Sequence, residues 1–77
     1  MSQPQLVLFH TEHCHLCEQA AALLQGAGLS YTHVDICDDP HLAERYGISI
    51  PVLQRVDSQL ELCWPFDLPQ IQAFLGV

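Results

Sequence analysis

Two cysteines, Cys14 and Cys17, stand between a short apolar run and a long amphipathic pattern. The spacing places both thiols at the first turn of a helix, where they can close into a disulfide. The N-terminus of a helix offers unpaired backbone N–H groups and a partial positive charge to the leading sulfur. A thiol held there loses its proton more easily, and the thiolate is the form that attacks disulfides. The motif therefore predicts a strand, a helix and a pair of thiols that exchange two electrons with other thiols.

The Cys-x-x-Cys spacing alone is a weak signal, because a chain with four cysteines in 77 residues produces some such pair by accident fairly often. A structural cross-link is the other interpretation. The loop it would close is so short that loop-closure entropy predicts about 2 kcal/mol at best. The strand–helix–strand pattern around the motif favours the redox interpretation.

Charge and length limit the partners and the location. Nine acidic residues face two arginines and no lysine, for a formal net charge of −7. Binding to phosphates needs clustered cations, so neither nucleic acid nor an anionic membrane is an expected partner. Residues 6–9 are too few for a signal or membrane-spanning segment, and we expect a cytoplasmic protein. In that compartment paired cysteines are more often catalytic or metal-binding than structural. With 49% hydrophobic residues in 77, we expect one globular domain over 1–77, acting as a monomer.

Periodicity and turn residues predict the element order βαβαββα. The expected strands cover residues 5–9, 31–36, 50–56 and 59–64, and the expected helices cover 14–25, 40–46 and the residues after Asp67. Two strands joined by a helix run parallel with a right-handed crossover, whereas the tight turn at residues 57–58 makes the last two strands antiparallel.

Helix ends and faces are marked by local signals. Asp39-Pro40 is typical of a helix start and Gly47 of a helix end. Asp67 and Gln70 form a capping box, with Phe66 and Ile71 in the positions of a hydrophobic staple. The buried stripe expected on the first helix is Leu16, Ala20, Leu23, Leu24 and Ala27, and on the last helix Ile71, Phe74 and Leu75.

Three segments resemble the glutaredoxin-like family of the thioredoxin fold. Residues 9–17 match its strand, loop and Cys-x-x-Cys segment, and Ser49-Ile50-Pro51 matches its Thr-Val-Pro loop. Trp64-Pro65-Phe66-Asp67 stands where the family has Gly-Gly-x-Asp, and small glutaredoxin-like proteins also carry Trp-Pro-Phe there. The resemblance covers essentially the whole chain. It implies an α/β, thioredoxin-like fold: a four-stranded mixed sheet in order 2-1-3-4 with three helices, the first and third on one face.

The resemblance also implies a dithiol–disulfide oxidoreductase. Cys14, nearer the helix end and solvent, would be the nucleophile, and Cys17, one turn inside, would resolve the mixed disulfide. His13 and His15 flank Cys14 and would stabilise its thiolate or move a proton, unless both are merely solvated loop histidines.

The implied substrate platform lies further along the chain. The family's proline is cis and lies beside the sulfurs, so Pro51 is expected to be cis, although an ordinary trans turn proline is the alternative. Ser49, Ile50 and Pro51 would then offer backbone to an extended substrate. Asp67 is a candidate for binding the amine of glutathione, besides serving as a helix cap.

Two departures from the family bear on the substrate. Typical glutaredoxins have lysine where this chain has Thr11, and Trp64-Pro65 replaces their paired glycines. We therefore expect no bound cofactor, with glutathione a co-substrate at most. The expected partners are disulfide-containing client proteins or low-molecular-weight thiols, and the expected electron donor is either a reductase or glutathione.

Other classes of function stay open. Five potential metal ligands fall within eight residues, which would suit zinc or, through Cys14 in a dimer, an iron–sulfur cluster: His10, His13, Cys14, His15 and Cys17. A thioredoxin-fold scaffold used only for binding is the remaining alternative. Cys37 is expected to be a semi-buried packing residue away from the motif, and Cys63 a packing or partly exposed one.

Overall fold

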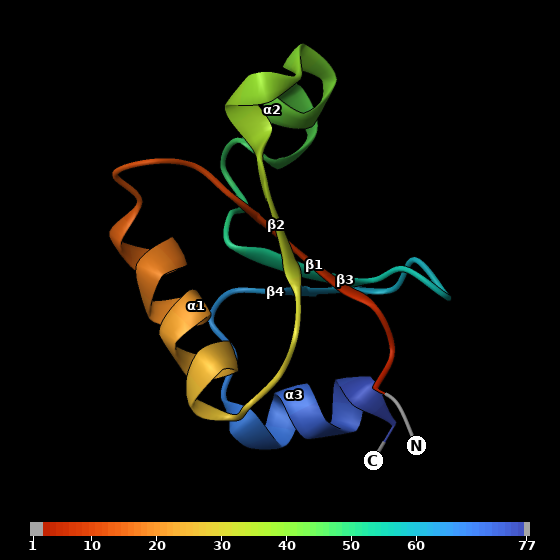
Figure 1. Ribbon diagram of the computed structural model, residues 1–77. Coiled ribbons are helices and arrows are strands. Elements are labelled where there is room, and N and C mark those ends of the chain that lie inside the picture. The colour runs from red at the N-terminus through yellow and green to blue at the C-terminus, as the bar shows by residue number, and fades with distance from the viewer. Residues whose placement is uncertain (1–2, 77) are drawn as a thin grey trace.

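The computed structural model describes residues 3–76, so residues 1, 2 and 77 of the predicted 1–77 domain lie outside the described residues. In chain order the elements are β1 (Leu6–His10), α1 (His15–Gly26), β2 (Thr32–Asp35), the 3-10 turn η1 (Ile36–Asp38), α2 (Pro40–Tyr46), β3 (Val52–Arg55), β4 (Glu61–Cys63) and α3 (Leu68–Leu75) (Figure 1). The predicted order is confirmed. The second, third and fourth strands are shorter than expected, and η1 was not anticipated.

Within residues 3–76 the strands form one mixed sheet in the order β2-β1-β3-β4, as predicted. β1 runs parallel to β2, and β3 runs antiparallel to both β1 and β4. The helix α1 carries the chain back between the two parallel strands, which a short turn could not do. In the same part of the chain, no helix is long and apolar enough to cross a membrane.

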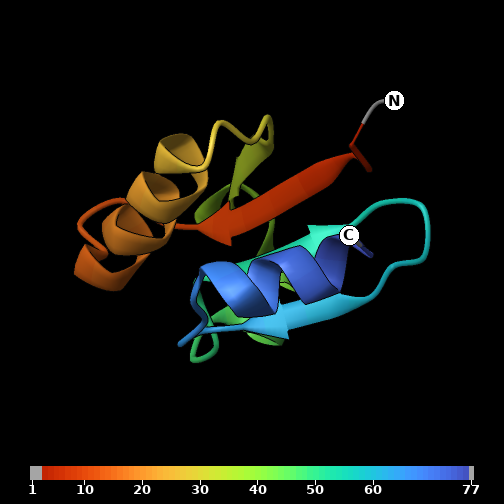
Figure 2. The same ribbon diagram turned by 90° about the horizontal axis from the view of Figure 1, so that it is seen from below.

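Alternation along β1 divides the core between the two faces of the sheet. Leu6 and Leu8 face α1 and α3 and join the larger buried cluster, which contains Ala20, Leu24, Leu53, Phe66, Ile71 and Leu75. Phe9 faces α2 and packs in a second cluster with Ile36, Tyr46 and Val52. Figures 1 and 2 show α1 and α3 near each other. In Figure 1, α2 lies well away from both of them. The predicted distribution of the helices over the two faces is therefore confirmed.

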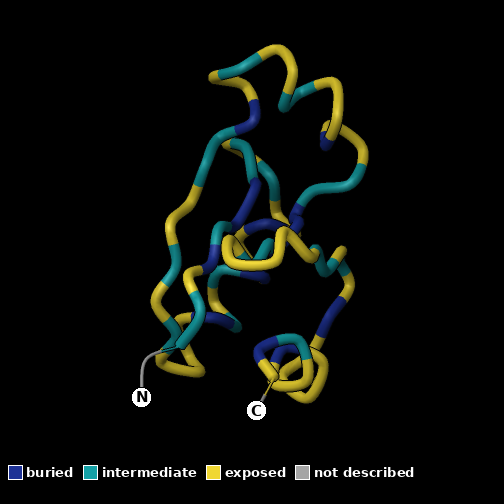
Figure 3. The backbone as a smooth tube through the Cα atoms, turned by 90° about the vertical axis from the view of Figure 1, so that its right-hand side faces the viewer, coloured by how far each residue is buried: buried dark blue, intermediate teal, exposed yellow. Residues whose placement is uncertain are grey.

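The buried face of α1 differs from the predicted stripe. Leu16 is 46% exposed and Ala27 is exposed, whereas Cys17, Ala20 and Leu24 are buried. The helix is rotated so that positions 17, 20 and 24, spaced three and four apart, meet the sheet. Figure 3 shows how buried and exposed stretches alternate along the chain. The second cysteine of the motif is therefore part of the packed face of the helix.

The predicted caps are present. Asp39 accepts the N–H of His41 at 2.9 Å and Pro40 follows it at the start of α2. At α3 the capping box is complete: Asp67 Oδ1 accepts the N–H of Gln70 at 3.0 Å, and Gln70 Oε1 accepts the N–H of Asp67 at 2.9 Å. These bonds satisfy backbone donors that the first turn of a helix leaves unpaired.

Candidate active site at the first turn of α1

Cys14 and Cys17 are joined by a disulfide, with their Cα atoms 5.2 Å apart. Cys14 is the N-cap of α1: its backbone is extended, its sulfur accepts the N–H of Cys17 at 3.2 Å, and its carbonyl accepts the N–H of Glu18 at 3.1 Å. Cys14 is half-buried, whereas Cys17 is only 4% exposed. The leading sulfur thus lies at the positive end of the helix and the second sulfur lies beneath it.

The histidines that flank Cys14 are solvated. His13 is exposed and has a positive φ of 59°, in the turn that leads into α1. His15 Nδ1 lies 3.5 Å from Glu18 Oε2, and these side chains are 85% and 76% exposed. An ion pair so exposed to water is weak. The assistance predicted from His13 and His15 stays a prediction.

The Ser49-Ile50-Pro51 loop is held from both sides. The Ile50–Pro51 peptide bond is cis, as the resemblance implied. The N–H groups of Ser49 and Ile50 donate to the carbonyl of Tyr46 at 2.8 and 3.1 Å, and the carbonyl of Pro51 accepts the N–H of Trp64 at 3.2 Å. Because the N–H of Ile50 already has a partner, the predicted pairing with an extended substrate would use the Ile50 carbonyl.

The positions that correspond to a glutathione site have structural contacts here. The Trp64 ring meets Phe66 edge-on, with ring centroids 5.1 Å apart, and packs against the larger core cluster. The Trp64–Pro65 bond is also cis. The Asp67 carboxylate caps α3. The capping role of Asp67 is therefore observed, and its part in binding glutathione stays a prediction.

The prediction for Cys37 is wrong. β2 ends at Asp35, earlier than expected, and η1 turns Cys37 toward the loop after β1. There its exposed sulfur is hydrogen-bonded to Thr11 Oγ1 at 3.2 Å. Thr11 lies three residues before Cys14 in the sequence. The Asp35 carboxylate accepts the N–H of Cys37 at 2.9 Å. That bond, with smaller help from Thr11 and His10, lowers the pKa of Asp35.

Cys63 is exposed on β4, consistent with the partial exposure considered for it.

A hollow of about 250 Å³ adjoins the disulfide. It lies between α1 and the adjoining parts of β1 and β2, and it is lined by Leu8, His10, Thr11, Cys14, Cys17, Glu18, Ala21, Gln25, Tyr31 and His33. His33 Nδ1 and His10 Nε2 are hydrogen-bonded at 3.2 Å. Sequence reasoning treated His10 only as a potential metal ligand and passed over His33. The one available signal was that His10 directly follows the expected strand 5–9, and His33 belongs to the strand expected to run beside it.

The five potential metal ligands near the motif do not gather into a site. Over residues 3–76, no group of three or more histidine, cysteine or acidic side chains is arranged to hold a metal ion. His13 and His15 are exposed, and His10 is paired with His33.

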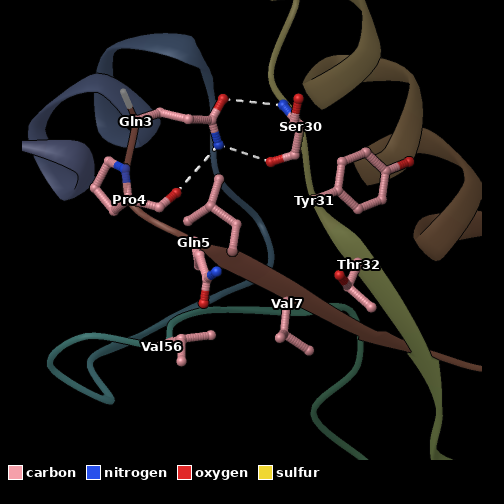
Figure 4. Close-up of a pocket in the computed structure, with 9 residues that line it drawn as sticks. Gln3, Pro4, Gln5, Val7, Ser30, Tyr31, Thr32 and Val56 are labelled. Atoms are coloured by element: carbon pink, nitrogen blue, oxygen red, sulfur yellow. Dashed lines mark hydrogen bonds between the residues drawn. The ribbon is translucent and has the colours of Figure 1, made fainter. Parts of the chain in front are cut away.

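A second hollow, of about 440 Å³, lies at the opposite end of β1. Gln3 bridges its rim: the side-chain amide donates to the carbonyl of Ser30 at 2.7 Å and accepts the N–H of Ser30 at 2.9 Å (Figure 4). None of its lining residues is a cysteine, a histidine or an acid. Its walls therefore offer no group for thiol chemistry.

Comparison with known proteins is consistent with this geometry. A family model described as Glutaredoxin-like domain (DUF836) matches residues 5–76. No curated protein shows significant similarity. The crystal structure of target protein XcR50 from X. campestris is 40% identical, with a TM-score of 0.83 over 92% of this chain and 95% of that one. The solution structure of XcR50 gives 40% identity and a TM-score of 0.80 over 92% and 91%. Protein Ne2328 from Nitrosomonas europaea is 31% identical, with a TM-score of 0.83 over 97% and 94%.

Proposed function

Because the chain belongs to the glutaredoxin-like domain family (DUF836), we propose that it is a thiol–disulfide oxidoreductase whose redox pair is Cys14 and Cys17. The observation that supports this most is the placement of the two sulfurs. Cys14 caps α1 with its sulfur facing the helix N-terminus, and Cys17 is buried one turn further on, within bonding distance of it. A disulfide with a purely structural role would stabilise the fold little, because the loop that it closes is so short.

The reaction follows from this asymmetry. In the reduced protein, the Cys14 thiolate attacks a client disulfide, a Cys14–client bond forms, and the first client sulfur leaves as a thiolate. Cys17 then attacks the Cys14 sulfur, which forms the Cys14–Cys17 disulfide and releases the second client sulfur. The client gains two electrons and the protein loses two. An external dithiol, or two molecules of a monothiol, restores the reduced pair.

As partners we propose disulfide-containing proteins or low-molecular-weight thiols, with a reductase or glutathione as the electron donor. We place the protein in the cytoplasm, where such donors are plentiful, and expect it to act as a monomer. We also expect glutathione to be a poor co-substrate. Thr11, which stands where typical glutaredoxins have lysine, is hydrogen-bonded to Cys37, and Trp64 packs on Phe66 where typical glutaredoxins have glycine.

The test is equilibration of the protein in glutathione redox buffers, with the oxidised fraction of the Cys14–Cys17 pair measured by alkylation and peptide mass. Cys37→Ser and Cys63→Ser are introduced first, because both sulfurs are exposed and would react. Reversible opening of the Cys14–Cys17 bond, and reduction of a model protein disulfide by the reduced chain, are expected. A pair that stays oxidised under strongly reducing buffer, or a reduced chain without activity, would indicate a binding scaffold instead.

The donor is tested separately. Turnover of a glutathionylated peptide by reduced glutathione is compared with turnover by thioredoxin reductase and NADPH. Low activity with glutathione is expected from the Trp64 and Thr11 contacts. Rapid deglutathionylation would show that these contacts do not obstruct glutathione.

A further inference from the structure

The resolving step of the proposed reaction needs a group to take a proton from Cys17. Cys17 is 4% exposed, and among residues 3–76 no polar or charged residue is buried. A thiol in such surroundings favours its neutral form. No buried carboxylate or lysine stands ready as a base, so the proton acceptor has to act from the hollow that adjoins the two sulfurs.

That hollow brings Cys14 and Cys17 together with an imidazole pair. Its volume of about 250 Å³ holds several water molecules, since each occupies about 30 Å³ in the liquid. His10 is half-buried at the end of β1, and His33 is exposed on β2. The pair thus runs from the hollow to bulk solvent.

The bond between the two rings allows the pair to carry one additional proton. It requires one nitrogen to donate and the other to accept. Two neutral rings satisfy this, and so does a pair with one imidazole and one imidazolium. Two imidazolium rings would set N–H against N–H and break the bond. The pair can therefore take up a single proton and keep its geometry.

Two carboxylates lie close to the imidazole pair. Asp35 is paired with His10 across β1 and β2, and His10 is one of the smaller causes that lower the pKa of Asp35. Glu18 contributes a second carboxylate from α1, although it also pairs with His15. The remaining titratable wall residue, Tyr31, accepts a hydrogen bond from the Gln25 amide at 3.0 Å, and a neutral phenol is a poor proton acceptor.

We propose that His10 accepts the Cys17 proton through water in this hollow and that His33 passes it to solvent. This proposal rests on the proposed redox function. In the step, the Cys17 sulfur attacks the Cys14 sulfur of the mixed disulfide, the Cys14–Cys17 bond forms, and the Cys14–client bond breaks. The client sulfur leaves with the bonding electron pair. The proton from Cys17 goes to the imidazole pair and then to water or to the leaving thiolate.

The experiment separates the two steps with an aromatic disulfide that releases one coloured thiolate at each step. In reduced protein that carries Cys37→Ser and Cys63→Ser, the first release is attack by Cys14, and its rate rises with reagent concentration. The second release is the resolving step by Cys17, and its rate does not depend on reagent concentration. Stopped-flow traces are recorded from about pH 5 to 8, the range in which imidazoles titrate.

The variants are His10→Gln and His33→Gln, and the control is His41→Gln, an exposed histidine at the start of α2. We expect His10→Gln to slow the second release at neutral pH by about tenfold to a hundredfold. Its pH profile should also change, so that the rate rises steadily with pH, as it does when hydroxide takes the Cys17 proton. His33→Gln should slow it less. The first release should stay within about twofold in every variant, which also shows that α1 is intact.

Two results would count against the idea in different ways. If His10→Gln keeps the second release and its pH profile, the imidazole pair is not the acceptor, although the redox pair stands. If the starting protein gives one release only and never forms the Cys14–Cys17 bond, the proposed function itself fails.

Discussion

The sulfur of Cys14 accepts the backbone N–H of Cys17 at 3.2 Å, so the first cysteine of the pair caps the helix that carries the second. A hydroxyl can fill the same position, because serine is among the preferred N-cap residues. Chemistry and helix stability at this position can therefore be separated by substitution.

Cys14→Ser should abolish disulfide reduction and leave the reduced protein about as stable as before, whereas Cys14→Ala should cost about 1 kcal/mol through loss of the cap. Cys17→Ser should instead accumulate mixed disulfides with clients, because the resolving thiol is missing. Activity assays, urea unfolding under reducing conditions and non-reducing gels check these outcomes. Accumulation of mixed disulfides by Cys14→Ser rather than by Cys17→Ser would reverse the assigned roles.

Leu24→Ala should lower the free energy of unfolding by about 2–5 kcal/mol, because Leu24 is fully buried between α1 and the sheet and its truncation leaves a cavity. Leu16→Ala is the matched control on the same helix. Leu16 is 46% exposed, and its truncation should change stability by about 0.5 kcal/mol or less. Equal losses in urea unfolding would contradict the observed rotation of α1.

Asp67→Ala should cost about 1 kcal/mol, since it removes the cap of α3 and half of the capping box with Gln70. Asp67→Asn keeps an oxygen acceptor and should lose little stability. The asparagine variant thus isolates the carboxylate charge. If Asp67→Asn folds normally but weakens turnover of a glutathionylated peptide severalfold, the carboxylate also binds substrate.

Asp35 should make the fold sensitive to acid. The N–H of Cys37 and smaller contributions lower the pKa of Asp35 from its ordinary value of 3.8, so the ionised form is favoured in the folded state. A lowered pKa gives stability that is present above the unfolded value and lost as the pH falls through the folded value. Asp35→Asn removes this titration. The stability difference between the wild type and Asp35→Asn should shrink as the pH falls below about 4, as measured by urea unfolding. A stability difference between the two proteins that does not vary with pH would contradict the predicted role of the Asp35 titration.

Tyr46→Phe should lower the free energy of unfolding by about 1 kcal/mol. The change removes the hydrogen bond from the Tyr46 hydroxyl to Glu61 but keeps the stack on Phe9, whose ring centroid lies 4.3 Å away. Glu61 still accepts a hydrogen bond from the Gln54 amide, which limits the loss.

Burial and then the Glu61 contact raise the pKa of Tyr46 above 10.0. Its contribution is therefore complete below that pH and is lost as the pH rises through the folded value. The phenylalanine variant should lack this alkaline loss in urea unfolding. Tyr31→Phe is the control, since its hydroxyl bonds Gln25 at an exposed site and should matter less.

Much of the fold was readable from the sequence because its signals are local. The caps at Asp39 and Asp67 and the cysteines at the start of α1 each depend on neighbours within about four residues. The Ser49-Ile50-Pro51 loop was found by resemblance, and no local rule identifies it. Strand direction followed from the lengths of the connections.

The parts that sequence reasoning missed depend on how distant segments align. Leu16 and Cys17 are both apolar residues at the start of α1, and only packing against β1 and α3 decided which of them is buried. Cys37 reaches Thr11 because η1 bends the chain after β2, 26 residues along from that threonine.

The pairing of His10 with His33 also depends on how distant segments align. The sequence predicted a strand at residues 31–36 that contains His33 and runs parallel to a strand ending just before His10. It could not set the register between those strands, because residues 23 positions apart meet only after the crossover helix has packed. In the structure His33 is paired with Leu8 and His10 with Asp35, and this register brings the two rings together at the edge of the hollow beside Cys14 and Cys17. Local preferences thus decided the elements and their ends, whereas side-chain packing between those elements decided which groups surround the sulfurs.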